Sequence, residues 1–318
     1  DGEAINFAST VDGGSGNNLS VSGGAGFAAA VSNVGVLSAN HIDSESTISA
    51  ASVTVSGTSD LGGNVSTTGA QSYGGATTLT ADVMLTASAL TATTINGAHN
   101  LVTSTTGATS LGTVGAGTPL ASLDVTAGST LTISSNVDTT GNISLTTTSG
   151  NVNISGSATV TTTSGNLLVN AEDDFSLAAT ATLVVPTGTV TVNIDTNGTG
   201  DASGGTGSIL GTVNAPGGLT INGNVDSDIF IITPSITTPI TVNGGDPTTL
   251  PGDIISITDL TSVVSVAPPG DGTYTTPGKE DVDFTGIESD NQVPQLDNLH
   301  LTDITDIIRN PTTTLSGT

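Results

Sequence analysis

The sequence predicts an all-β fold built on a parallel β-helix, or β-solenoid. One observation is the composition: 42 of the 318 residues are Gly, 9% are charged and 2% are aromatic. Short apolar and hydroxyl side chains with little charge suit strands that stack in narrow layers. The other two observations are short strand signals at regular spacing and whole phrases that repeat.

The strand signals are three to five residues long and alternate apolar with polar residues. From Leu123 to Val190 they begin mostly seven to nine residues apart, with turn residues between them. Two or three signals would make one coil of roughly 20–25 residues, giving about eight coils over the first part of the chain, residues 1 to about 194. The residues expected to point into the core are Leu131, Ile133, Ile143, Leu145, Val152 and Ile154.

Repeated phrases support stacking of coil on coil. The segment 146–151, TTTSGN, returns as 161–166, and NVSTTG at 64–69 is echoed by NVDTTG at 136–141. Strands this short make a poor free-standing antiparallel sheet, but each can rest on the previous turn of a solenoid. The alternative is a string of small β-sandwiches, which usually need longer strands and larger core residues. The chain has five Phe, two Tyr and no Trp, which favours the solenoid.

A change in composition predicts three parts. Only Pro119 and Pro186 precede residue 195, whereas the other ten of the 12 prolines follow it. We therefore expect a β-solenoid over 1–204 and a smaller all-β unit over 205–290, either a sandwich or a cap on the open solenoid end. Residues 291–318 form a tail whose apolar residues, from Leu296 to Ile308, are expected to be covered by docking on a neighbouring subunit. The alternative is that the tail folds back onto its own cap.

Several phrases resemble those of filamentous-haemagglutinin-like exoproteins, giant bacterial surface proteins with parallel β-helix repeats. They are Ile5–Phe7 with Thr10–Gly13, Val65–Tyr73 and Ala76–Asp82. Segments 228–235, 240–247, 250–253 and 284–288 look like the module that closes such repeat arrays. The resemblance covers residues 1 to about 288. It implies a secreted cell-surface structure with a role in adhesion.

The net charge of the chain restricts the classes of partner that it could bind. With 28 acids against two bases, Lys279 and Arg309, the formal charge is −26. Nucleic acid and anionic membrane surfaces would repel such a chain, and no apolar run is long enough to insert into a membrane. Cysteine is absent, so no disulfide or thiol chemistry is expected. Since the chain begins Asp1-Gly2-Glu3, we expect a mature product or an excised segment.

Self-repulsion on this scale calls for cations, and calcium is the candidate outside a cell. The loop 195–201, DTNGTGD, places oxygen ligands at alternate positions with glycines for a tight turn, as calcium loops do. It lacks the terminal bidentate Glu, and a plain Asx-Gly turn is the alternative. A second set of acidic residues, also a candidate calcium site, lies between residues 271 and 288. The predicted calcium ligands are Asp195, Asn197, Asp201, Asp271, Asp281, Asp283 and Glu288.

Enzymatic roles receive little support from the sequence. A polysaccharide lyase needs a base and cations near a uronate, and the solenoid half has neither Lys nor Arg. A glycosidase uses two carboxylates on one side of a cleft, but adjacent strand residues such as Asp173 and Asp174 point to opposite faces. The histidines (His41, His99 and His300) have no metal-ligand spacing. The Thr-rich runs are too irregular for an ice-binding array and suit stacked Thr ladders.

The sequence therefore predicts a non-catalytic extracellular structural protein that assembles with itself, as the subunit of a bacterial surface filament, sheath or surface layer. An adhesin stalk of a two-partner-secretion-type exoprotein is the first alternative. A solenoid enzyme acting on a neutral glycan is the second. Further partners would be other surface proteins or neutral glycans.

Overall fold

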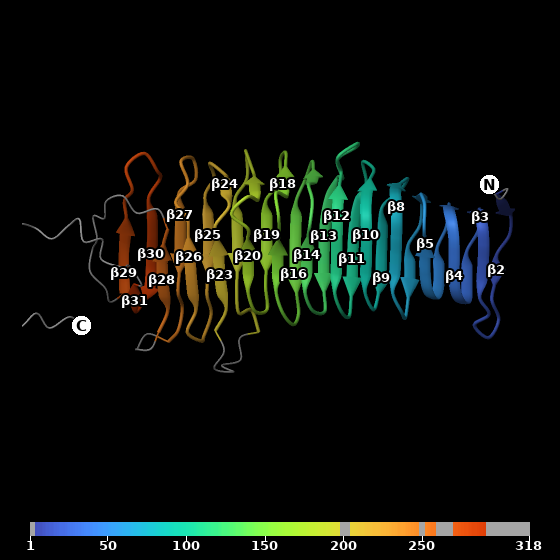
Figure 1. Ribbon diagram of the computed structural model, residues 1–318, viewed down its shortest axis with the longest axis horizontal. Helices are drawn as coiled ribbons and strands as arrows, with labels where there is room; N and C mark the ends of the chain where they lie inside the picture. Colours follow the sequence, from blue (N-terminus) through green and yellow to red (C-terminus); the bar gives the residue numbers. More distant parts are fainter. Residues whose placement is uncertain (1–3, 198–203, 248–251, 259–269, 291–318) are drawn as a thin grey trace, which may run out of the picture.

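The computed structural model describes residues 4–197, 204–247, 252–258 and 270–290, and in these ranges the chain forms strands and no helix. They form a parallel β-solenoid of about 12 turns. Figure 1 shows the strands side by side along one long axis, from the N-terminal strands at one end to β29 and β30 at the other. The predicted solenoid is confirmed, and the alternative of a string of sandwiches is wrong.

The strands stack into three parallel ladders, which we name A, B and C in the order in which each turn visits them from β2 onwards. Ladder A contains β2 (Val11–Asp12), β7 (Val65–Thr67), β9 (Val83–Ala87), β11 (Asn100–Thr105), β13 (Ser122–Ala127), β16 (Ile143–Thr147), β19 (Leu167–Asn170), β22 (Val190–Asn193), β25 (Leu219–Asn222), β27 (Ile240–Asn243) and β30 (Val282–Ile287).

Ladders B and C complete each turn. Ladder B contains β14 (Leu131–Ile133), β17 (Val152–Ile154), β20 (Phe175–Leu177), β23 (Thr206–Ile209), β26 (Ile229–Ile232), β28 (Ile254–Ile257) and β31 (Ser289–Asp290). Ladder C contains β1 (Ile5–Phe7), β6 (Ser59–Leu61), β15 (Val137–Thr139), β18 (Thr159–Thr162), β21 (Thr182–Val184) and β24 (Thr212–Asn214).

In the N-terminal half, long strands bend around the corners and belong to more than one ladder. They are β3 (Leu19–Phe27), β4 (Val31–Ser44), β5 (Ile48–Val55), β8 (Gln71–Leu79), β10 (Leu90–Asn96) and β12 (Thr109–Val114). Register shifts mark bends in β3, in β4 and in the pairing of β10 with β8. From β13 onwards, turn residues separate the strands at each corner.

The length of a turn agrees with the spacing of the strand signals. Leu123 of β13 registers with Ile143 of β16, and Ile143 with Leu167 of β19, which are steps of 20 and 24 residues. Ala25 registers with Ile42, a step of 17 residues in the tighter N-terminal turns. About 12 turns at roughly 4.8 Å each give a rod roughly 55–60 Å long.

The core runs along the rod as stacked columns of aliphatic side chains. All six residues expected to point inward are at most 1% exposed. The largest fully buried side chains are Tyr73, Phe27, Phe175 and Phe230. Stacking like on like in parallel register buries each side chain against the turns before and after it, so each turn depends on its neighbours for its core.

The strands after residue 204 continue this coil. β23, β25, β26 and β27 pair in parallel with strands of the preceding turns. The described residues of 205–290 therefore extend the solenoid and do not form a separate sandwich, because their inward residues extend the same core columns. Only β29 (Gly270–Tyr274) runs antiparallel, against β30 at the last turn, where a cap would lie. The predicted docking tail, 291–318, lies outside the described residues.

In the described ranges, no helix is long and apolar enough to cross a membrane.

Candidate functional site

Acidic residues gather at one corner of the last five turns, where ladder A passes to ladder B. We name this the acid corner. The equivalent earlier segments, 88–89, 106–108, 128–130 and 148–151, contain no acid. The described acids of the acid corner are Glu172, Asp173, Asp174, Asp195, Asp226, Asp228, Asp246, Asp253 and Glu288.

Two of the predicted calcium ligands of loop 195–201 lie at this corner. Asp195 is 1% exposed and has a left-handed backbone with φ of 50°. Its carbonyl oxygen accepts from Asn224 Nδ2 at 2.8 Å, and Asn197 Nδ2 donates to Glu172 Oε1 at 2.9 Å. The third predicted ligand, Asp201, lies outside the described residues. The described part of the loop is thus tied to neighbouring turns by hydrogen bonds.

The second predicted calcium group is divided between two places. Asp271 Oδ1 accepts from the Gly286 amide at 3.3 Å, and Asp283 Oδ1 accepts from Thr273 Oγ1 at 2.6 Å, both within the β29–β30 pair. Asp281 is exposed just before β30. Glu288 instead lies at the acid corner, where its Oε2 accepts from the Asp253 amide at 2.8 Å. Within the described ranges, no three acidic or histidine side chains are grouped so as to hold a metal ion.

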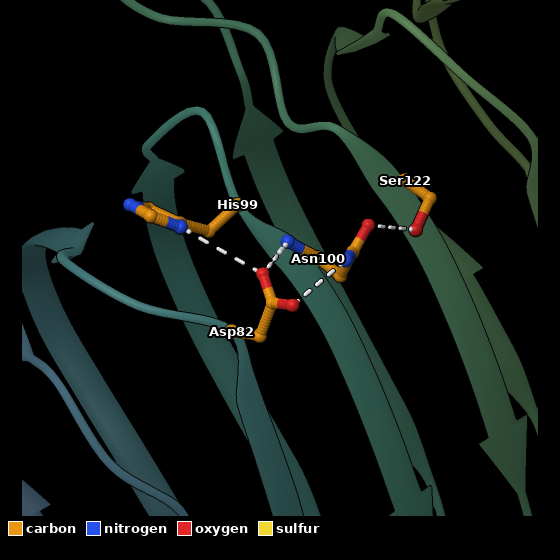
Figure 2. Close-up of polar contacts among 4 residues, drawn as sticks. All are labelled: Asp82, His99, Asn100 and Ser122. Carbon is orange, nitrogen blue, oxygen red and sulfur yellow. Dashed lines mark hydrogen bonds and ion pairs between the residues drawn. The ribbon is translucent and has the colours of Figure 1, made fainter.

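A polar cluster on the outside of three consecutive turns is the place where a histidine meets a carboxylate. Figure 2 shows Asp82, just before β9, in contact with His99, which immediately precedes β11, and with Asn100, the first residue of β11. Asp82 Oδ1 lies 3.7 Å from His99 Nδ1 and accepts from the Asn100 amide at 2.9 Å. Asp82 Oδ2 accepts from Asn100 Nδ2 at 2.9 Å. These hydrogen bonds from Asn100, more than the nearby His99, lower the pKa of Asp82.

The geometry of this cluster does not support a serine nucleophile. Ser122 Oγ donates to Asn100 Oδ1 at 2.7 Å, so its proton is directed at an amide oxygen and not at a histidine (Figure 2). A nucleophilic serine needs a base within hydrogen-bond reach. His99 and Asp82 are 38% and 66% exposed, so water screens the ion pair. The cluster acts as a series of cross-turn hydrogen bonds.

The remaining candidate catalytic groups also serve cross-turn bonding. Asp174 Oδ1 accepts from the Thr206 amide at 2.8 Å, and its Oδ2 accepts from Asn151 Nδ2 at 3.2 Å. His41 Nδ1 lies 2.7 Å from Thr58 Oγ1. His300 lies outside the described ranges.

Asparagine corners recur along the solenoid, and sequence reasoning missed them. Asn64, Asn142 and Asn166 each precede a ladder A strand, and each Oδ1 accepts a backbone amide from the next turn at 2.8–3.0 Å. Their donors are Met84, Asn166 and Thr189. The signal available in the sequence is the Asn that recurs in the turn clusters. These side chains link each turn to the next.

A shallow groove lies on the N-terminal turns. It encloses about 360 Å³ and is lined by Val21, Ser22, Ser38, Ala39, Asn40, Thr54 and Ser56. All of these side chains are small and uncharged. Its hydroxyl and amide groups would suit a neutral, hydroxyl-rich ligand.

No family model, no curated protein and no solved structure matches this chain.

Proposed function

We propose that the protein is a non-catalytic structural rod of a bacterial extracellular surface, and that it assembles end to end with itself. The observation that supports this most is the continuity of the ladders. Parallel strands and buried columns run through the described turns from β3 to β30. A rod of this kind gains length by adding turns, which suits a spacer or filament.

Polar side chains at the corners of the turns support the same proposal. Asp82, Asp174 and Asn166 each accept a backbone amide from another turn. Side chains committed to such bonds stabilise the stack, and freeing them for proton transfer would cost those bonds. The resemblance to filamentous-haemagglutinin-like exoproteins agrees with this role and remains part of the proposal.

A free sheet edge gives the route for assembly. Among the described residues, β1 pairs only with β3 and β2 only with β4, so their outer edges face away from the stack. Unpaired N–H and C=O groups on such an edge are a template for another strand. A second copy would cover the edge in a filament, whereas a preceding turn of a longer chain would cover it in an adhesin stalk.

Electron microscopy of the 318-residue chain at rising concentration tests the proposal. We expect filaments whose width is that of one rod. Isolated rods at all concentrations would overturn end-to-end assembly and favour the stalk. The adhesin alternative also draws on the neutral groove, and a neutral oligosaccharide that binds there would support it.

A matched pair of variants locates the contact. Ile5 on β1 is 49% exposed, and Ile236, between β26 and β27, is 66% exposed. Ile5→Lys places a charge on the free edge and should abolish filaments, because charged edge residues block strand addition. Ile236→Lys makes the same change away from the edge and should leave them intact. Equal effects of the two variants would contradict docking at β1.

A further inference from the structure

Two of the corner asparagines begin tripeptides of the kind that accept N-linked sugars. Asn64-Val65-Ser66 and Asn142-Ile143-Ser144 both fit the pattern Asn-x-Ser, in which the middle residue is not proline. Each asparagine is exposed just before a strand of ladder A, and the residue after it is buried in the core. Because successive strand residues point to opposite sides, the serine lies on the outer face. The asparagine and the serine of each tripeptide are therefore presented on the same side of the rod.

The two polar atoms of the asparagine side chain differ at these corners. Oδ1 of Asn64 accepts from the Met84 amide at 2.8 Å, and Oδ1 of Asn142 accepts from the Asn166 amide at 2.9 Å. Nδ2 of neither asparagine makes a hydrogen bond to another described residue. An N-linked sugar is attached to Nδ2 and leaves the carbonyl oxygen in place. Attachment at these corners would therefore remove no hydrogen bond between turns.

The same tripeptide also occurs at a less accessible place. Asn153-Ile154-Ser155 repeats the residues of 142–144, but Asn153 is the central residue of β17. It is half-buried between Thr132 and Ser176, its partners in register on the turns before and after. Ser155 Oγ donates to the Ile133 carbonyl at 3.3 Å. A sugar on Asn153 would have to pass between the side chains of two turns, so the fold distinguishes two identical tripeptides.

The sequence contains two further Asn-x-Ser/Thr tripeptides, and each differs from the corner sites in one respect. Asn18 accepts from the Val36 amide at 2.8 Å, but it lies on the first turn, beside the edge that assembly would cover. Asn197 uses its Nδ2 to donate to Glu172 Oε1 at 2.9 Å, so a sugar there would displace a hydrogen bond between turns. Asn64 and Asn142 combine exposure, an unbonded Nδ2 and a place away from the ends of the rod.

We propose that Asn64 and Asn142 are acceptor sites for N-linked glycosylation, in which a separate transferase supplies the sugar from a nucleotide-activated donor. Nδ2 forms a bond to the anomeric carbon of the sugar and loses a proton to the transferase. The bond from that carbon to the nucleoside diphosphate breaks, and the diphosphate leaves. This inference rests on the surface location in the proposed function, because such sugars belong to exposed parts of secreted chains, and not on end-to-end assembly.

Both sites lie at the corner where a turn enters ladder A. The pairings β7–β9, β9–β11, β11–β13 and β13–β16 place them four turns apart. Their sugars would therefore stand on one edge of the rod. Bulky hydrated groups on that edge would hold neighbouring rods apart there and leave the strand edges at the ends uncovered.

Transfer to the folded 318-residue chain tests the proposal, with a soluble asparagine glucosyltransferase and UDP-glucose as the donor. Peptide mass mapping then gives the fraction of each asparagine that carries a hexose. We expect a hexose on Asn64 and Asn142 and none on Asn153, whose tripeptide is the same as that of Asn142. Equal modification of Asn142 and Asn153, or none at either corner, would overturn the proposal. The reaction is read on isolated chains, so its failure is distinguishable from a failure to form filaments.

Two substitutions test the geometry of the acceptor. Asn166 is an exposed corner asparagine whose Oδ1 accepts from the Thr189 amide at 3.0 Å, but Leu168 stands in register with Ser144 of the previous turn. Leu168→Ser completes the tripeptide and should make Asn166 carry a hexose. Ser144→Ala removes the hydroxyl and should abolish transfer to Asn142. An unmodified Asn166 in the Leu168→Ser chain would contradict the proposal.

Hydrogen exchange shows whether the hydrogen bond at the corner survives the modification. The Asn166 amide donates to Asn142 Oδ1, and we expect its protection to be the same with and without a hexose on Asn142. Asn142→Ala is the control, because it removes the acceptor and should lower that protection. If the hexose lowers protection as far as Asn142→Ala does, the sugar breaks the bond, and a corner asparagine is not a suitable acceptor.

Discussion

At the scale of single residues, this solenoid depends on side chains that reach from one turn to the next and on glycines that let turns approach. The corner oxygen of Asn142, for instance, satisfies a backbone amide that the ladder leaves unpaired. Unsatisfied backbone amides are costly when buried, so the corner residues contribute as acceptors. At corners where the backbones of two turns are in contact, glycine is needed because a Cβ atom would collide with the neighbouring turn.

Gly128, between β13 and β14, tests the close approach of two turns. A Cβ there would collide with the backbone of Thr106 on the previous turn, and no other constraint applies, since its φ is not left-handed. We expect Gly128→Ala to lower the free energy of unfolding by about 1–3 kcal/mol, the usual cost of overpacking. Urea denaturation measures it.

The matched control is Gly117→Ala, where the nearest atom to a new Cβ is a side-chain oxygen at ordinary contact distance. It should change the free energy of unfolding by no more than about 0.5 kcal/mol. If the two variants are equally stable, the turns are further apart than the structure places them.

At the scale of elements, the outer face of ladder A carries a stack of asparagine amides over four turns. Asn193 Nδ2 donates to Asn170, Asn222 Nδ2 to Asn193 and Asn243 Nδ2 to Asn222, each at 2.7 Å to the Oδ1 atom. At the end of the stack, Thr285 Oγ1 donates to Asn243 Oδ1 at 3.0 Å. Each amide both donates and accepts, so the stack aligns β19, β22, β25 and β27 in register.

Removing one member should break two of these bonds. We expect Asn222→Ala to lower the free energy of unfolding by about 1–3 kcal/mol, at about 0.5–1.5 kcal/mol for each lost hydrogen bond. Asn153→Ala on β17 is the control, because that outward side chain is equally half-buried and lies outside the stack. A loss as large for Asn153→Ala would show that strand propensity, and not the amide stack, is responsible. Thermal unfolding by circular dichroism gives both values.

At the scale of the whole molecule, the chain has a formal charge of −26, and each turn of the rod contacts only its neighbours. Like charges on successive turns repel along the axis. The hydrophobic columns and backbone ladders hold the rod together against this repulsion. The balance between them depends on salt, because salt screens exposed charges and leaves the buried core unaffected.

We therefore expect the Tm to rise by several degrees when NaCl is increased from about 0.01 to about 0.15 M, as the screening length shortens from roughly 30 to 8 Å. Calorimetry at both concentrations measures the change. Calcium chloride at equal ionic strength separates screening from binding. A further rise with calcium would support the cation role predicted for loop 195–201, and a Tm unaffected by either salt would contradict the electrostatic account.

The sequence by itself determined the fold class and the inward face of the central strands. Short alternating segments at regular spacing predicted the solenoid, and residues such as Leu131 and Ile154 are buried as expected. This succeeded because alternation has a period of two, so each strand specifies its own inner face. The repeated turn phrases likewise marked the corners.

Only the tertiary structure decided how the second half of the chain folds and which side chains meet. Prolines after residue 195 suggested a separate unit, yet β23 and β26 continue ladder B in parallel register. Asp228 and Asp253 are 25 residues apart and Glu288 is a further 35 away, so no fixed spacing links them. Because the loops between turns differ in length, equivalent positions of successive turns do not recur at a fixed spacing in the sequence. In the folded chain these positions lie side by side, because the ladder hydrogen bonds fix the register of the strands whatever the length of the loop.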